Sequence, residues 1–226
     1  RPPQHRSGPS RRRGSGRLGH LVVKGPSTPF DPAIDTLPVG HLLHRVFTAA
    51  RKPIEFNPGI GAPTRFGFFG KPVVPIMYAA ETEEAAIAET LLHNVPPEGG
   101  VLAYDGYSHT ALVRLEVTRE LRLAVLHGLG LRRLKVRAED VTSSPASSYP
   151  DTVRWAEAAH GIGIDGMAWM SRLCNNARAY VFFGDRCADA FAQDPSHARI
   201  FASPADQMWL IDLCAPLHVE VLLQPS

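Results

Sequence analysis

Length and composition describe a globular protein with one hydrophobic core: the chain has 226 residues (24.6 kDa), 44% of them hydrophobic and 20% charged, with a net charge of +2. No apolar run reaches the roughly 18–20 residues needed to cross a bilayer, which excludes a membrane-spanning helix. The three cysteines form no CxxC pair and their odd number argues against a disulfide framework, so we expect buried thiols in a reducing cytoplasm.

Residues 1–30 carry the basic character of the chain. They hold seven arginine and lysine residues and no acidic one, which leaves 17 basic against 22 acidic residues, a net charge of −5, over residues 31–226. Because this segment is rich in Pro, Gly, Ser and Arg, we predict a disordered tail, followed by a single domain over residues 31–226. The run Arg11-Arg12-Arg13 could contact nucleic acid, but a solvated tail is the simpler interpretation, and we expect no nucleic-acid partner.

Apolar segments along the chain predict clustered strands with few helices between them. The candidate strands are residues 41–47, 73–80, 111–117, 121–125, 166–170, 179–183 and 208–213. The candidate helices are residues 82–93, 130–136 and 151–159, the first of them capped by Thr82. Because strands do not alternate strictly with helices, we expect an α+β fold with mixed or antiparallel sheets and flanking helices.

Glu89 lies on the inward arc of the predicted helix over residues 82–93. It projects only about 40° around the helix axis from Ala85, on the side of the apolar residues. A carboxylate in that position is costly unless it is paired or binds something. One interpretation is an ion pair with Arg45 or Arg65, and the other is an active-site acid at the wall of a cleft.

Four further polar side chains stand in strands or at strand ends. Arg45 and Arg65 are ordinary paired arginines if taken singly, but together they favour a phosphate clamp, because guanidinium groups bind phosphate bidentately. Tyr78 ends a strand, where a place in the core competes with stacking on a ligand. Ser171 follows a strand and has no nucleophile elbow around it, so its plain interpretation is a turn residue.

Local motifs for metals and cofactors are missing from the sequence. It contains no HExxH, no P-loop and no zinc-type Cys/His spacing. We therefore expect no metal and no cofactor.

Five short segments, in this order, resemble the RES domain family, which is named for its Arg, Glu and Ser. The segments are residues 44–47, 64–66, 77–80, 85–89 and 169–172, with residues 182–186 behind them. Each is weak alone, and the resemblance rests on their order and spacing over about residues 40–190. The family includes the toxins of RES–Xre toxin–antitoxin pairs, which are similar in fold to ADP-ribosyltransferases and degrade NAD by hydrolysis or phosphorolysis.

The resemblance implies an NAD site. In it, Arg45 and Arg65 would contact phosphates, and Tyr78 would pack against the nicotinamide or its ribose. Glu89 would be the catalytic carboxylate and Ser171 the site serine. NAD would be the substrate, water or phosphate the acceptor, and a helix-turn-helix (Xre-type) antitoxin the partner. One departure is Val46, which stands next to Arg45 where some members have a tyrosine.

Three functions of different classes fit these residues. The first is a toxin-like enzyme that cleaves the nicotinamide–ribose bond of NAD by hydrolysis or phosphorolysis. The second is an ADP-ribosyltransferase that moves the same group onto a protein or nucleic acid, and only the fate of the ADP-ribose separates it from the first. The third is a binding module without catalysis, against which the presence of all five polar residues argues.

Overall fold

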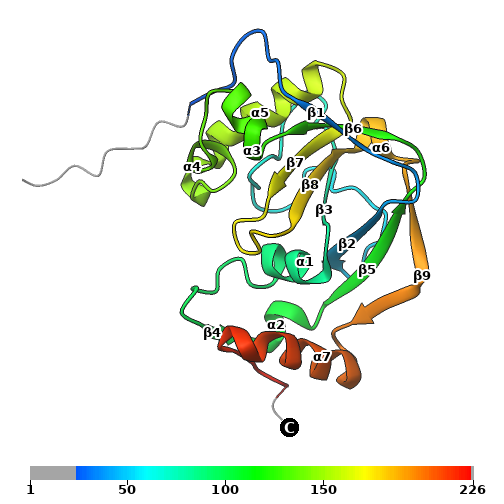
Figure 1. The fold of residues 1–226 in the computed structure, drawn as a ribbon. Helices are drawn as coiled ribbons and strands as arrows, with labels where there is room; N and C mark the ends of the chain where they lie inside the picture. The colour runs from blue at the N-terminus through cyan, green and yellow to red at the C-terminus, as the bar shows by residue number, and fades with distance from the viewer. Residues whose placement is uncertain (1–23, 225–226) are drawn as a thin grey trace, which may run out of the picture.

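Eight strands form one curled, mixed sheet, which confirms the α+β fold (Figure 1). The structure is a computed structural model that describes residues 24–224. In sheet order the strands are β1 (Ile34–Leu37), β6 (Leu121–Val125), β7 (Gly166–Met170), β8 (Arg178–Phe183), β3 (Ile76–Ala80), β2 (Leu42–Thr48), β5 (Thr110–Val117) and β9 (Phe191–Ile200). Neighbouring strands are antiparallel except β6 and β7, which run parallel.

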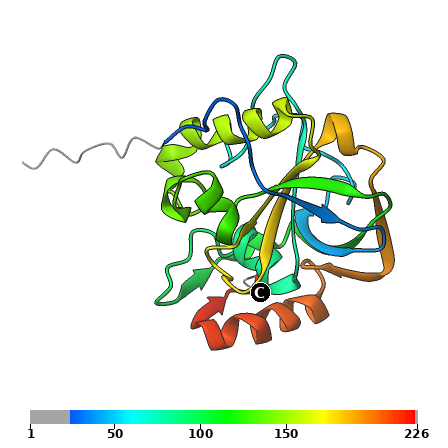
Figure 2. The ribbon, with the colours of Figure 1, turned by 45° about the horizontal axis from the view of Figure 1, so that its top comes forward.

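The helices gather around this sheet, with α5 and α7 at opposite ends of the molecule (Figure 2). They are α1 (Glu83–Thr90), α2 (Tyr104–Tyr107), α3 (Gly128–Arg133), α4 (Ala138–Val141), α5 (Tyr149–Gly161), α6 (Gly184–Cys187) and α7 (Pro204–Cys214). Two short 3₁₀ turns are η1 (Ala146–Ser148) and η2 (Ala215–Leu217). Beside α7, β4 (Gly100–Leu102) and β10 (Val219–Val221) pair in parallel as a separate small sheet.

The two faces of the large sheet are covered by different cores. On one face, Ile76, Trp169 and Val181 pack with Trp155 of α5. On the other face lies a cluster that includes Leu43, and side chains at alternate positions of the same strands, such as Met77 and Phe182, belong to it. A third cluster lies under α1 and includes residues of α2 and α7. Because side chains alternate along a strand, a residue's position in β2 or β3 decides which core it joins.

Helix α1 is held tightly against the sheet by small residues. Thr82 caps it as predicted, since its hydroxyl accepts from the Ala85 N–H at 3.2 Å. Ala85, Ala86 and Ala88 are buried, and their short side chains allow the helix to approach β2 and β3 closely. The helix ends at Thr90, three residues before the predicted end.

One predicted strand is wrong and one long strand was not predicted. Residues 208–213 lie in α7, where the buried residues Leu210 and Cys214 are spaced by four, as on one face of a helix. Their run of apolar residues is also typical of a buried strand, which is why a strand was predicted. Strand β9 was missed because most of its residues are polar or exposed, and it forms at the sheet edge through its pairing with β5.

The folded unit extends further toward the N-terminus than predicted. The Trp155 indole N–H donates to the carbonyl of Lys24 at 3.1 Å, and the Phe30 ring packs edge-on against Trp155. Residues 24–30 are therefore part of the domain, and the remainder of the predicted tail, residues 1–23, lies outside the described residues. All three cysteines are free, and Cys187 and Cys214 are buried, but Cys174 is partly exposed, against the prediction. No helix in residues 24–224 is long and apolar enough to cross a membrane.

Candidate active site

Glu89 and Ser171 meet where α1 packs beside the end of β7. The Ser171 hydroxyl donates to Glu89 Oε1 at 2.5 Å and accepts from the backbone N–H groups of Leu173 and Cys174 at 3.2 and 3.0 Å. Ser171 is only 1% exposed, whereas Glu89 is half-buried. A hydroxyl has only one proton to donate, and Ser171 donates it to Glu89. This hydrogen bond fixes the orientation of the Glu89 carboxylate.

The interpretation of Ser171 as a turn residue is confirmed. Ser171 begins the turn between β7 and β8, where a serine hydroxyl that accepts from the next backbone N–H groups stabilises the chain reversal. The same turn carries the hydroxyl to Glu89. Glu89 forms no ion pair with Arg45 or Arg65, so its partner in residues 24–224 is a hydroxyl and not the arginine that we considered.

Arg65 is buried close to Glu89 without a carboxylate partner in the described chain. Its guanidinium donates to the carbonyls of Val141 and Ser144 at 3.3 and 2.9 Å and to the Ser144 hydroxyl at 2.8 Å. Burial lowers the pKa of Arg65, and the charges of Arg172 and Glu89 are near enough to act on it as well. Because carbonyls orient the guanidinium but do not neutralise it, its positive charge remains available to an anion.

Tyr78 holds the segment that carries Arg65. Its hydroxyl lies 2.9 Å from the Thr64 hydroxyl and accepts from the Phe66 N–H at 3.1 Å, while its ring packs edge-on against Trp169. Burial raises the pKa of Tyr78 to about 12, so the phenol stays neutral and keeps its proton for hydrogen bonding. The structure thus brings four of the five predicted residues near one another: Tyr78 holds the segment of Arg65, Arg65 lies near Glu89, and Glu89 accepts from Ser171.

Arg45 is not brought to this group. It follows the alternation of β2 with Leu43, on the face opposite Tyr78. Its guanidinium donates to the carbonyls of Pro53 and Glu55 at 2.5 and 2.8 Å, and burial lowers its pKa to about 10. The geometry is that of an arginine that ties down the loop after β2.

A pocket of about 1000 Å³ opens at Ser171, the partner of Glu89, while Glu89, Arg65 and Tyr78 themselves are not among its lining residues. Its lining includes Ala88 of α1, Leu92 just after α1, and Ser171 after β7, and its volume is at the upper end of the range for small-molecule sites. Arg172 and Asn175, from the turn that Ser171 begins, supply polar groups to the same space. The pocket is therefore large enough for an extended ligand such as a dinucleotide.

Two residues of this site were missed in the sequence. Arg172 lines the pocket directly, and its position next to Ser171 was the signal that could have identified it. His93 lies four residues after Glu89, in the turn that follows α1, and its ring nitrogen Nε2 is 3.3 Å from the Tyr149 hydroxyl. Burial lowers the pKa of His93, and the charge of Arg172 lowers it further, so this histidine is neutral at pH 7.

Comparison with known proteins relates the sequence of this chain to one family and its fold to a solved structure. Residues 42–205, which include all five predicted site residues, match the model of the RES domain. No curated protein sequence matches the chain. A chain in the crystal structure of the M. tuberculosis MbcT–MbcA toxin–antitoxin complex superposes with a TM-score of 0.56 at 13% sequence identity, covering 76% of this chain and 90% of that one. At this identity the structural similarity concerns the fold.

Proposed function

The chain belongs to the RES domain family, and from that premise we propose that it cleaves the nicotinamide–ribose bond of NAD, with Glu89 as the catalytic carboxylate. The observation that carries the proposal is the short hydrogen bond that fixes Glu89 to buried Ser171 beside a pocket of about 1000 Å³. A carboxylate held in one orientation next to such a space is suited to stabilising positive charge on a bound substrate.

The proposed reaction breaks the bond between C1′ of the ribose and the nicotinamide nitrogen. The bonding electrons leave with nicotinamide, which becomes neutral, and positive charge develops on the ribose ring as in an oxocarbenium ion. Glu89 stabilises that charge, because Ser171 occupies one of its oxygens and leaves the other free to face the ribose. An oxygen of water or phosphate then attacks C1′ and loses its proton to solvent or to a neighbouring base.

We propose that two arginines, Arg172 and Arg65, hold the diphosphate. Arg172 lines the pocket. Arg65, which the carbonyls of Val141 and Ser144 orient, lies near enough to Arg172 for the two charges to interact. In the proposal, these two arginines attract the phosphates. Tyr78 packs against the nicotinamide or its ribose, while its hydroxyl keeps the Arg65 segment in place.

Exchange of Arg65 or of Arg45 for methionine, one at a time, is expected to separate the roles of these two residues. Arg65→Met should raise KM for NAD at least about tenfold, because an unneutralised buried cation is lost. Arg45→Met should leave KM unchanged but lower the free energy of unfolding by about 1–3 kcal/mol, because the carbonyls of Pro53 and Glu55 lose their donor. Steady-state kinetics and thermal unfolding of both variants check this prediction. A large rise in KM for Arg45→Met would return that residue to the phosphate clamp.

The experiment that tests the function is NAD consumption by the purified full chain, with and without phosphate, with products resolved by chromatography. Free nicotinamide with ADP-ribose is the result for hydrolysis, and a phosphate-dependent phosphorylated ADP-ribose is the result for phosphorolysis. Labelled ADP-ribose attached to a protein or nucleic acid would identify a transferase instead. Intact NAD after incubation with well-folded protein would contradict the proposal.

We further propose that the protein is the toxin of a toxin–antitoxin pair and acts in the cytoplasm on cellular NAD. A protein of the same fold was crystallised in a toxin–antitoxin complex, and the exposed side chains of Leu173 and Leu217 make an apolar rim around the pocket. An Xre-type antitoxin that covers this rim would close the site. Expression of the chain alone is expected to arrest growth and lower cellular NAD, and Glu89→Gln should abolish both effects.

A further inference from the structure

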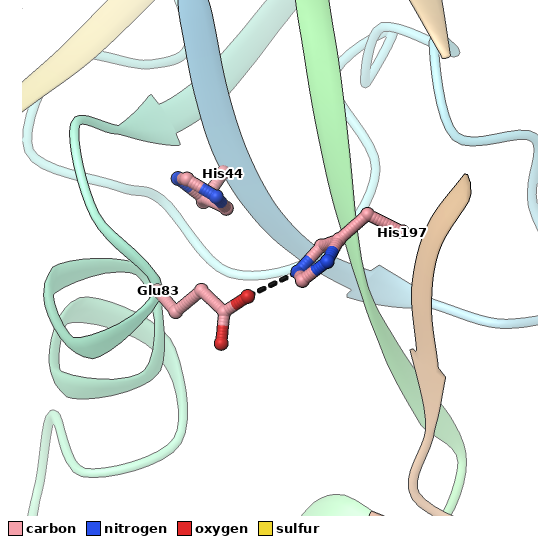
Figure 3. A group of neighbouring side chains, drawn as sticks. All are labelled: His44, Glu83 and His197. Carbon is pink, nitrogen blue, oxygen red and sulfur yellow. Dashed lines mark hydrogen bonds and ion pairs between the residues drawn. The ribbon is translucent and has the colours of Figure 1, made fainter. Parts of the chain in front are cut away.

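Away from the NAD pocket, three side chains from three different elements converge at the start of α1. They are His44 of β2, Glu83 of α1 and His197 of β9, all half-buried (Figure 3). One nitrogen or carboxylate oxygen from each residue lies within 4.8 Å of the others. The ligand atoms of a tetrahedral zinc site are about 3.3 Å apart, so small side-chain rotations are enough to reach that geometry.

A hydrogen bond to the backbone leaves one ring nitrogen of His44 free to bind a metal. His44 Nδ1 lies 3.3 Å from the carbonyl oxygen of Glu81. Since a carbonyl can only accept, this hydrogen bond places the ring proton on Nδ1 and leaves the lone pair of Nε2 free. Metal-binding histidines commonly have this support, in which the second ring nitrogen donates to a carbonyl or carboxylate.

His197 reaches the group because β9 is irregular at that point. The pairing of β9 with β5 shifts register between Val113 and Leu115, so that the residues of β9 between Gln193 and Ala198 form a bulge. Arg114 holds the bulge through an ion pair with Asp194 at 2.6 Å. Bulges redirect side chains, and here the result is that His197 Nε2 contacts Glu83 Oε1.

The second oxygen of Glu83 is also occupied. Arg199 Nε lies 3.6 Å from Glu83 Oε2, and its guanidinium lies over the Trp209 ring at 4.0 Å. Arg199 thus faces the outer oxygen of the carboxylate at ion-pair distance, without a hydrogen bond from its Nε within residues 24–224, while Oε1 lies against His197.

We propose that His44, Glu83 and His197 bind one divalent transition-metal ion of the zinc class, with a solvent molecule as fourth ligand. Two imidazoles and one carboxylate are a donor set that zinc accepts in proteins, with ligand distances of about 2.0–2.2 Å. The ion would replace the hydrogen bond between His197 and Glu83. No local motif in the sequence predicts the group, because its members are far apart along the chain.

The proposed ion would connect α1, through Glu83, to β2 through His44 and to β9 through His197. Glu83 is the first residue of α1 and Glu89 follows six residues later, about 9 Å along the helix axis. The metal would therefore anchor the helix that carries the catalytic carboxylate without contacting the substrate. The proposal stands independently of the NAD chemistry.

The test is a calorimetric titration of zinc chloride into the full chain after chelator treatment and dialysis. We expect one ion per chain, and a thermal midpoint that rises by roughly 5–10 °C at a hundredfold excess of zinc over its Kd. Cobalt in place of zinc should give the visible absorption of a tetrahedral ion without a thiolate charge-transfer band, which excludes Cys174 as the ligand.

Variants locate the ion. Glu83→Gln and His197→Gln should each weaken zinc binding at least about 100-fold. The matched control is His160→Gln. His160 contacts Asp185 at 2.8 Å, and this His–carboxylate pair has no third ligand among residues 24–224. We expect this variant to bind zinc as wild type does. The proposal is overturned if wild type binds no zinc at one equivalent. It is equally overturned if both ligand variants, folded by circular dichroism, bind zinc as tightly as wild type.

Discussion

Glu89→Gln is expected to slow NAD cleavage by about 10²–10³-fold while the fold stays unchanged. The amide has nearly the size of the carboxylate, and its oxygen can still accept the hydrogen bond that Ser171 donates. The variant loses only the negative charge beside the ribose, and a preorganised charge of this kind stabilises a transition state by roughly 3–4 kcal/mol. The measurement is the initial rate of nicotinamide release at limiting and saturating NAD.

A matched control is available on the same helix. Glu84 is an exposed residue of the first turn of α1, so Glu84→Gln removes one negative charge without touching the pocket. We expect this variant to keep the wild-type rate, which would show that the effect of Glu89→Gln does not come from the net charge of the helix. Equal rates for wild type and Glu89→Gln would remove Glu89 from the mechanism.

The pairing of Glu89 with Ser171 shows what sequence reasoning can and cannot provide. Helical geometry correctly placed Glu89 toward the interior, because that depends only on neighbours along one helix. Its partner is 82 residues away and was not predictable, since the contact depends on where the turn after β7 lies relative to α1. An arginine was the obvious partner for a buried acid, but Arg65 instead binds the carbonyls of Val141 and Ser144.

Arg45 illustrates a different limit. In the structure, alternation along β2 separates Arg45 from His44 and Val46, which point to the other face. The sequence does not reveal which of the two faces carries the pocket, because that depends on how α1 and the turn after β7 pack on the sheet. The five residues can therefore keep the order found in the family while one of them, Arg45, binds the carbonyls of the loop after β2.

The fold was predictable where burial is strong and local. The central strands β7 and β8 are nearly continuous runs of buried apolar residues, and both were predicted within one residue of their ends. The edge strand β9 has no such run, because its stability comes from pairing with β5 and not from its own side chains. The candidate metal group depends on this unpredicted strand, which is why it could not be anticipated.

Ser171→Ala is expected to lower kcat for NAD cleavage by about 10–100-fold with little change in KM. A hydrogen bond to a charged group contributes about 1.5–3 kcal/mol, and each 1.36 kcal/mol corresponds to a factor of ten in rate. Without the hydroxyl, Glu89 loses the donor that fixes its orientation, whereas the contacts proposed between NAD and the arginines are not removed. Steady-state kinetics on the purified variant measure both constants.

The same substitution also leaves two backbone N–H groups, those of Leu173 and Cys174, without their acceptor. A loss of about 1–3 kcal/mol in the free energy of unfolding is therefore expected, and a merely structural serine would show this loss alone. The double variant Glu89→Gln/Ser171→Ala separates the two roles. If Ser171 acts on catalysis through Glu89, the double variant is no slower than Glu89→Gln, because the oriented charge is already gone. Fully multiplicative rate losses would instead mean that Ser171 contributes to the reaction independently of Glu89.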